Sequence, residues 1–232
     1  MKKNRKPLLS SGDYLLFLAI VLAVVSTTMN IFCMKSLSFG TPIIICDAGL
    51  IVSWGVFLIS NVITEVWNEK TAIKLVTFSA FVTFFIMIIA RLIVEIPTLP
   101  DYYEQADAFA KIFSNGPRTI IASITAFLVG NYVNVHIIQK VKDYLANKDN
   151  KIFFFLRASF STLIGQMVDN ALFMFLAFAP IGLSVYEMNV FDIITAVLSG
   201  TFIELVVETC LVPFITIPLT AHIKRVIKRE ME

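Results

Sequence analysis

One lipid-length apolar stretch, residues 153–178, carries polar side chains at positions where a bilayer would penalise them. Arg157, Gln166, Asp169 and Asn170 interrupt a run of mostly phenylalanine, leucine and alanine. At about 100° per residue, Gln166, Asp169 and Asn170 fall on one side of a helix. A charge at the centre of a bilayer costs about 2.5–3.5 kcal/mol even on insertion scales. This side is therefore expected to face a cavity that holds a polar solute.

A pair of carboxylates lies in the last apolar segment. Glu204 and Glu208 are four residues apart and share one side of a helix with Thr201. Two ionised carboxylates at this spacing repel each other. One of them is therefore expected to be protonated, to pair with Arg157 or Arg91, or to bind a solute rich in hydrogen-bond donors.

Two other segments also align polar residues on one helical face. Trp54, Asn61 and Glu65 share a face in the first of them, where Trp54 could stack on a flat ring or pack in the core. Asn131 and Asn134 share a face in the second, and hydrogen bonding between helices is the alternative to ligand contact there. Glu65 is either functional or an interfacial residue that reaches water.

Helices that cross a bilayer must position these residues. The chain is 57% hydrophobic and 16% charged over 232 residues, far from the average of soluble domains. About 20 apolar residues span a bilayer core, and six such segments leave no room for a separate soluble domain. We expect one all-α membrane domain over residues 1–232. Its spans are predicted at about 14–33, 43–63, 72–96, 119–139, 154–178 and 190–217, with an outer loop over 97–118.

Positive charges predict the orientation of these spans. Most of the 19 Lys and Arg residues lie before the first span, in the second and fourth connections, or after the sixth span. Positively charged connections stay in the cytoplasm, so both termini are expected there. In the loop 97–118, Tyr102, Phe109 and Ile112 are expected on a short interfacial helix, and a lid over an outer entrance is the alternative. Counted from the span ends, Asn131, Gln166, Asp169 and Glu204 lie near the midplane, where transporters bind their solutes.

Other chemistry is sparse in the sequence. Cys33, Cys46 and Cys210 lack metal or redox spacing and are interpreted as packing residues. His136 and His222 are too separate for a metal site, and no cofactor is predicted. The net charge of +2 reflects topology rather than nucleic-acid binding. The sequence contains no phosphate-binding loop motif, so we expect no ATP hydrolysis by this chain.

Three segments carry spaced polar residues: GVFLISNVITEVWNEKTA, RTIIASITAFLVGNYVNVHIIQKVK and FLRASFSTLIGQMVDNALFMFLAF. The first is similar to (F/L)-x-x-(S/T)-D-x-x-(S/T)-E-x-(Y/F)-G-x-x-x-A, and the second to R-x-x-x-A-S-x-x-A-(Y/F). The third is similar to R-x-x-x-S-T-x-x-(G/S)-(Q/N)-x-x-D-(T/N)-x-x-F-x-x-(I/L)-A-F. These are patterns of the bacterial queuosine precursor transporters, six-span proteins of a vitamin-uptake-type group, which the chain resembles over residues 55–178.

The resemblance implies a fold like that of the substrate-binding subunits of vitamin transporters. It implies import of 7-deazaguanine bases (the nitrile form, the aminomethyl form or queuine) across the bacterial plasma membrane for tRNA queuosine salvage, and no enzymatic activity. Four residues depart from the usual pattern: Asn61 replaces aspartate, Trp67 tyrosine, Asn68 glycine and Asn170 a common threonine. Asn61 and Asn170 could alter which precursor is accepted.

The edge of a deazaguanine suits this chemistry. A carboxylate of Asp169 or Glu204 can accept from its ring N–H and its exocyclic amine, and Gln166 or Asn131 can donate to its carbonyl oxygen. The complete set of predicted substrate-binding residues is Trp54, Asn61, Glu65, Asn131, Asn134, Arg157, Gln166, Asp169, Asn170, Glu204 and Glu208.

The sequence is compatible with several modes of energy coupling, with a homodimer and with one other class of function. Energy coupling could be facilitated diffusion with trapping, proton coupling through Glu204 or Glu208, or an external ATP-driven module. In the last case the chain is the substrate-binding subunit of an energy-coupling-factor vitamin transporter. A second copy of the chain, in a homodimer, is a further possible partner. An intramembrane enzyme that uses Asp169 and Glu204 as an acid/base pair is the remaining function class.

Overall fold

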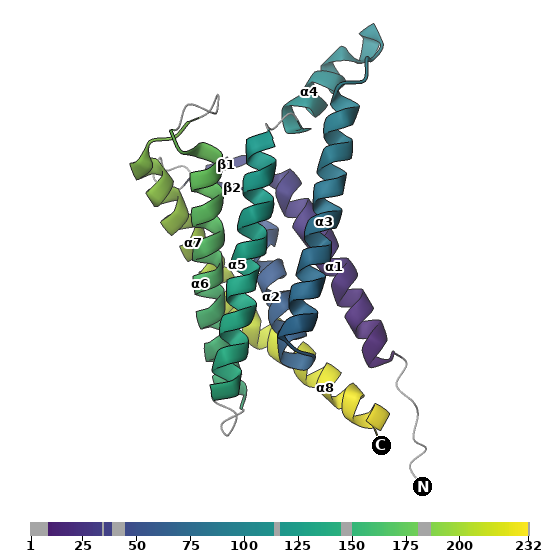
Figure 1. The fold of residues 1–232 in the computed structure, drawn as a ribbon, viewed down its shortest axis with the longest axis vertical. Coiled ribbons are helices and arrows are strands. Elements are labelled where there is room, and N and C mark those ends of the chain that lie inside the picture. The colour runs from purple at the N-terminus through teal and green to yellow at the C-terminus, as the bar shows by residue number, and fades with distance from the viewer. Residues whose placement is uncertain are drawn as a thin grey trace.

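The computed structural model describes residues 9–33, 35–38, 45–113, 117–144, 150–180 and 187–231, which form mainly helices (Figure 1). A small antiparallel hairpin is the strand structure of this part of the chain, with Ser36 paired to Asp47. The elements are α1 Ser11–Phe32, β1 Ser36–Ser38, β2 Ile45–Asp47, α2 Leu50–Val66, α3 Glu69–Val94, a 3-10 turn Pro100–Tyr102, α4 Tyr103–Phe113, α5 Pro117–Tyr144, α6 Lys151–Phe178, α7 Val190–Leu211, a π-helical segment Val212–Thr216, and α8 Ile217–Met231.

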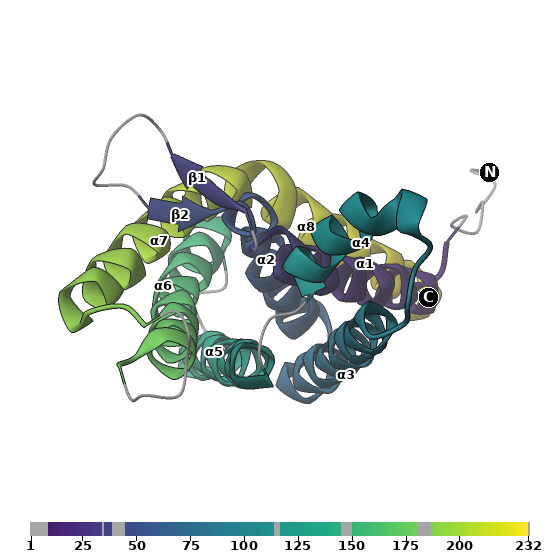
Figure 2. The same cartoon turned by 90° about the horizontal axis from the view of Figure 1, so that it is seen from above.

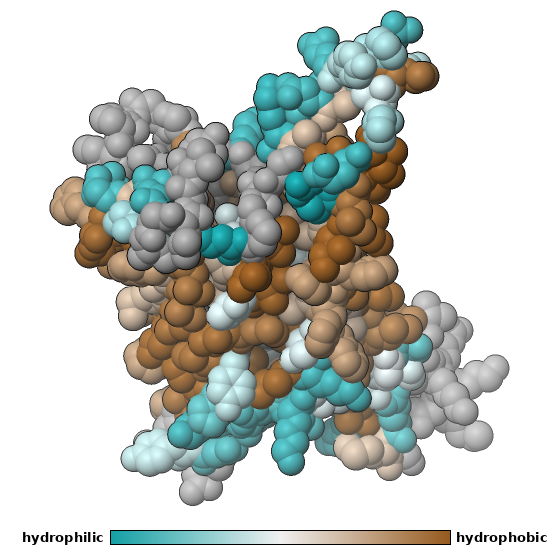
Figure 3. Space-filling model, turned by 45° about the horizontal axis from the view of Figure 1, so that its top comes forward, coloured by the Kyte–Doolittle hydropathy of each residue, from teal (hydrophilic) through white to brown (hydrophobic). Residues whose placement is uncertain are grey.

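Five helical stretches are long and apolar enough to cross a membrane. They are α1, α3, most of α5, α6, and the continuous stretch from α7 through α8. Figure 3 shows apolar side chains over the middle of one face and hydrophilic ones towards its ends, as a bilayer requires. The chain is therefore a helical multi-pass membrane protein, and a sixth crossing stays a prediction.

The predicted second span, 43–63, is wrong at its start. Residues 45–47 form β2, and α2 begins only at Leu50 and contains 17 residues. Asp47 therefore lies outside the helix that carries Trp54, Asn61 and Glu65. Residues from Gly55 to Glu65 are all buried, because α2 packs against α1, α3, α5, α7 and α8 (Figure 2). A helix surrounded by other helices is shielded from lipid, so it can carry polar residues on several sides.

The predicted sixth span, 190–217, is interrupted near its end. Pro213 has no N–H to donate to the preceding turn, and the backbone changes to the wider π-helical pattern over Val212–Thr216. The Ile217 N–H accordingly bonds to the Val212 carbonyl, five residues back. Beyond it, α8 is a separate basic helix that reaches Met231 and leaves the axis of α7 (Figure 1).

Both ends of the described chain lie at the same end of the bundle. The Ser11 backbone N–H donates to Glu230 Oε1 at 2.7 Å, and Tyr14 Oη lies 2.8 Å from His222 Nε2. This end is opposite α4 (Figure 1). The same-side arrangement agrees with the predicted topology, while the assignment of this side to the cytoplasm stays a prediction.

Residues 97–118 contain the short helix that the sequence predicts. Every residue of α4 is at least partly exposed, and α4 packs against the end of α3. The sequence-based alternatives, an interfacial helix or a lid, both remain predictions.

The helices α5 and α6 approach each other closely at two glycines, Gly130 and Gly165. A Cβ atom added to Gly130 would lie 2.6 Å from Asp169 Cβ and 2.9 Å from the Gly165 carbonyl oxygen. A Cβ atom added to Gly165 would lie 2.7 Å from Asn134 Cβ. Small residues allow membrane helices to pack backbone against backbone. This glycine contact sets the positions of Asp169 and Asn134.

We expect Gly130→Ala to destabilise the protein, because neither backbone nor Cβ neighbours can give way. Overpacking of this kind typically costs about 1–3 kcal/mol, which thermal unfolding of the purified protein in detergent would detect. Gly12→Ala is the matched control, because its added Cβ meets only Ser10 Oγ, at 3.7 Å. Equal unfolding temperatures for the two variants would contradict the importance of the glycine contact.

Candidate functional site

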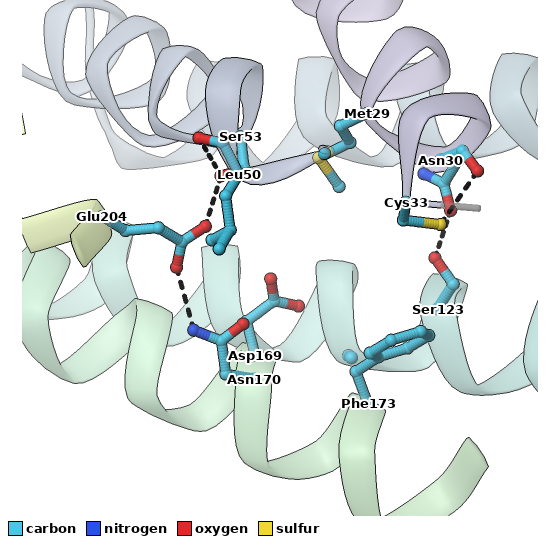
Figure 4. A pocket seen from close by; sticks show the side chains of 12 residues that line it. Met29, Asn30, Cys33, Leu50, Ser53, Ser123, Asp169, Asn170, Phe173 and Glu204 are labelled. Carbon is cyan, nitrogen blue, oxygen red and sulfur yellow. Dashed lines mark hydrogen bonds between the residues drawn. The ribbon is translucent and has the colours of Figure 1, made fainter. Parts of the chain in front are cut away.

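A pocket lies between α1, α2, α5, α6 and α7 (Figure 4). Residues of the end of α1, the start of α2 and the first part of α5 line it, together with residues of α6 and α7. Its empty volume, with the open solvent at its mouth included, is about 480 Å³. Seven side chains from five helices carry its polar and aromatic character: Asn30, Ser53, Ser123, Asp169, Asn170, Phe173 and Glu204.

Glu204 is fixed by donors from two neighbouring helices. Its carboxylate accepts hydrogen bonds from Ser53 Oγ on α2 and, at 2.9 Å, from Asn170 Nδ2 on α6. The same Asn170 amide donates to Thr201 Oγ1 at 3.1 Å. The side chain of Glu204 is thus buried and oriented, which satisfies part of its hydrogen-bonding capacity inside the bundle.

Asp169 has a different environment, although it is adjacent in sequence to Asn170. Its carboxylate points into the pocket (Figure 4), and its Cβ is held close to Gly130. No hydrogen-bond donor among the described residues contacts it. A carboxylate with two free acceptor oxygens at this depth is suited to a ligand that brings its own N–H or O–H donors.

The pocket is also lined by residues that were not predicted from the sequence as binding residues. Asn30 on α1 accepts from Ser123 Oγ on α5, and its Nδ2 donates to the Ser26 carbonyl at 2.8 Å. Phe173 presents its ring to the same space (Figure 4). The spacing of Asn170 and Phe173, three residues apart, could have indicated a shared face. Asn30, at the end of an otherwise apolar span, gave a weaker signal.

Five further polar residues form a middle level that does not line the pocket. Glu208 accepts from Thr162 Oγ1 at 2.7 Å, from Asn61 Nδ2 at 3.2 Å and from Gln166 Nε2 at 3.4 Å. Asn134 Nδ2 donates to Asn61 Oδ1 at 2.9 Å. All five side chains are buried. Asn61, Asn134, Gln166 and Glu208, which the sequence analysis grouped with Asp169, therefore lie beyond the pocket.

A lower level, nearer to the chain ends, is built on Glu65. Its carboxylate lies 2.5 Å from Arg157 Nη2, with both side chains 1% exposed, and it also contacts Lys142 and Lys224. These three cations come from α6, α5 and α8. Arg157, one of the proposed partners for Glu204 and Glu208, is thus engaged by Glu65, and Arg91 pairs with Glu95 on its own helix.

Two predicted residues lie away from the three levels. Asn131 is buried, donates to the Phe127 carbonyl at 3.0 Å, and borders a groove between α3 and α5. Trp54 packs against the apolar core, and its Nε1 donates to the Ile51 carbonyl at 2.6 Å. The ligand contacts predicted for Asn131 and Trp54 have no support in this arrangement, whereas the core alternative for Trp54 agrees with it.

The three levels follow the length of α2. Ser53, Asn61 and Glu65 mark them in turn, separated by roughly 12 Å and roughly 6 Å at 1.5 Å per residue. The upper level offers carboxylates to a pocket, the middle level is a hydrogen-bonded network, and the lower level is an ion-pair cluster. A column of this kind through an apolar bundle is typical of membrane proteins that move polar solutes.

The apolar helices and the buried polar column define the class: a multi-pass membrane protein of the solute-transporter type. The family model described as "Putative vitamin uptake transporter" matches residues 47–217, and the chain belongs to this family. The match includes α2, α5, α6 and α7 and thus most residues of the three levels. No curated protein and no solved structure matches the chain.

We expect Glu65→Gln to destabilise the protein strongly, because it leaves the buried guanidinium of Arg157 without its carboxylate. Loss of one partner of a buried ion pair typically costs about 3–5 kcal/mol. Thermal or denaturant unfolding in detergent measures the effect. Glu95→Gln is the control, because exposed pairs contribute up to about 1 kcal/mol and Glu95 is 67% exposed. Equal losses in the two variants would contradict a structural role of the Glu65–Arg157 pair.

Proposed function

We propose that this protein imports a 7-deazaguanine precursor of queuosine across the bacterial plasma membrane. The carboxylate of Asp169 carries this proposal, because it projects into the pocket with no described donor to satisfy it. Membership of a vitamin-uptake family supports uptake of a small organic solute. The resemblance of residues 55–178 to queuosine precursor transporters supports the choice of solute.

The pocket offers a complementary group for each part of the base. The ring N–H and the exocyclic amine of a deazaguanine are adjacent donors, which one carboxylate, that of Asp169, accepts together. The carbonyl oxygen of the base requires a donor. Asn30 Nδ2 uses one hydrogen on the Ser26 carbonyl and has a second one for the ligand. Asn30 thus takes the place of Gln166 and Asn131, which the sequence analysis suggested for this role.

The flat face of the base has an aromatic partner in the same pocket. Phe173 is the aromatic residue among the described lining side chains, and offset or edge contacts between rings contribute about 0.5–1.5 kcal/mol beyond burial. Phe173 therefore replaces Trp54 as the proposed stacking residue.

We expect Asp169→Asn to weaken binding of 7-cyano-7-deazaguanine roughly 10- to 100-fold, because the side chain then presents a donor to a donor edge. This range corresponds to the loss of about 1.5–3 kcal/mol for a charged hydrogen bond. Calorimetry or radioligand binding to the purified protein measures it. Asp192→Asn, at the exposed start of α7, is the control and should bind normally. Normal binding by both Asp169→Asn and Glu204→Gln would overturn the proposed site.

Uptake into proteoliposomes that contain this protein alone distinguishes the transport alternatives. We expect accumulation or equilibration of the labelled base without a second protein. A requirement for an ATP-driven module would instead identify the chain as the substrate-binding subunit of an energy-coupling-factor transporter. Recovery of a chemically altered base would indicate the intramembrane enzyme.

Comparison of the nitrile form, the aminomethyl form and queuine in the same assay identifies the preferred precursor. Guanine as competitor tests whether the five-membered ring is read. If guanine competes as well as the three deazaguanines, the queuosine assignment is wrong while the import of a purine-like base stands.

A further inference from the structure

Glu208 is a buried carboxylate whose contacts are all with neutral groups. Its side chain is 1% exposed, and its donors are a threonine hydroxyl and two amides. Within the described part of the chain, no lysine, arginine or histidine forms an ion pair with it. Glu65, one level lower, contacts three cations. Buried carboxylates in proteins are paired with a cation, coordinate a metal ion or are neutralised by a proton, and the described side chains provide no cation for Glu208.

The carboxylate also fixes the orientation of the amides around it. The Thr162 hydroxyl donates its hydrogen to Glu208, so it accepts from Asn61 Nδ2, 3.0 Å away. Asn61 therefore turns its Oδ1 towards Asn134, and Asn134 must present Nδ2 to it. The Ser60 hydroxyl, which donates to the Phe57 carbonyl, likewise accepts from Asn134 Nδ2 at 3.3 Å.

This chain of donors leaves two buried amide oxygens without a hydrogen-bond partner. Asn134 Oδ1 is one, and Gln166 Oε1 is the other; both side chains are fully buried. Rotation of the Gln166 amide does not help, because it would place Oε1 against Glu208 Oε2 at the 3.4 Å now spanned by Nε2. Two acceptors would then face each other. In either orientation of the Gln166 amide, Gln166 Oε1 and Asn134 Oδ1 have no hydrogen-bond donor or cation as a partner among the described residues.

Asn134 and Gln166 are neighbours across the glycine contact of α5 and α6. A Cβ on Gly165, the residue before Gln166, would lie 2.7 Å from Asn134 Cβ. Gln166 in turn contacts the carboxylate of Glu208. One carboxylate and two residues with unpaired amide oxygens thus belong to neighbouring parts of the middle level.

The composition of this region selects the type of ion. Hard cations prefer carboxylate and amide oxygens, and a single carboxylate neutralises one positive charge. No cluster of three or more His, Cys, Asp or Glu side chains occurs in the described residues, and such clusters are common ligands of transition metals. We propose that Glu208, Gln166 and Asn134 bind one Na⁺ ion at the middle level.

An ion at this position also accounts for the carboxylate pair of α7. Glu204 and Glu208 are one helical turn apart, and a cation beside Glu208 offsets the repulsion between them. Glu204 then remains available to the pocket as an acceptor. The occupied ion site therefore favours binding of a donor-rich base, an extension that rests on the proposed function.

Thermal unfolding of the purified protein tests the ion site with no base present. NaCl is titrated against choline chloride at constant ionic strength, and KCl serves as a second series. We expect a saturable rise of the unfolding temperature with Na⁺ and none with choline, because a ligand of the folded state stabilises it. Glu208→Gln should abolish the rise, while Glu95→Gln, an exposed glutamate on α3's C-terminal end, should retain it.

Binding of ²²Na⁺ to the unaltered protein makes the proposal testable even if Glu208→Gln does not fold. We expect about one displaceable ion per chain. Absence of ²²Na⁺ binding, equal stabilisation by Na⁺, K⁺ and choline, or an unchanged Na⁺ response in folded Glu208→Gln would overturn the site. A response to pH alone would also overturn it and indicate a proton at Glu208.

A final measurement links the two sites. The affinity for the base, with and without Na⁺, should change by the same factor as the affinity for Na⁺ with and without the base. The assays without base do not depend on the identity of the solute. A failure of the queuosine assignment therefore leaves the ion site intact, and a failure of the ion site leaves the pocket intact.

Discussion

The contact between the backbones of α5 and α6 is the constraint on which the polar interior depends. At Gly130 and Gly165 the two helices come so close that a single added carbon would overlap with its neighbours. Asp169 and Asn134 stand directly beside this contact, one in the pocket and one in the middle level. Since their side chains start from two helices in direct contact, their separation is set by the backbone. Larger residues in place of Gly130 or Gly165 would push α5 and α6 apart and would displace the side chains of both levels.

The charge balance changes along the column in a definite order. The pocket contains two carboxylates, of which Glu204 accepts hydrogen bonds from described donors, and the middle level contains one carboxylate among neutral donors. The lower level surrounds one carboxylate with three cations. A solute rich in donors is thus attracted at the upper end and meets a closed ion-pair cluster at the other. The pocket and the ion-pair cluster are thus separated by the middle level of hydrogen-bonded side chains.

Much of this column was predictable from the sequence, but its division into levels was not. Periodicity placed Asp169, Asn170 and Glu204 on helical faces, and the cost of polar groups in lipid indicated that these faces point inward. Periodicity fixes the angle of a residue on its own helix only, and the identity of the facing helix depends on packing. Asn131 was therefore assigned to the binding site although it borders the α3–α5 groove, and the pairing of Glu65 with Arg157, 92 residues away, was missed.

Two boundaries were wrong for local reasons. The apolar residues before Leu50 suit a membrane helix, but part of them pairs with Ser36–Ser38 in a hairpin. Composition does not distinguish a short apolar strand from the first turns of a helix. At the other end of the chain, Pro213 interrupts the predicted span through a π-helical segment, after which the chain continues for another 15 residues as α8.

The π-helical segment changes the direction in which all later side chains project from the helix axis. Compared with an uninterrupted α-helix, a wider turn of this kind delays the rotation of every later side chain by about 100°, the angle of one residue. Lys224 contacts Glu65 from α8, after this change of rotation. The position of Pro213 thus influences which face of α8 is turned towards the bundle. The π-helical segment orients α8, and Lys224 of α8 contributes a cation to the lower level.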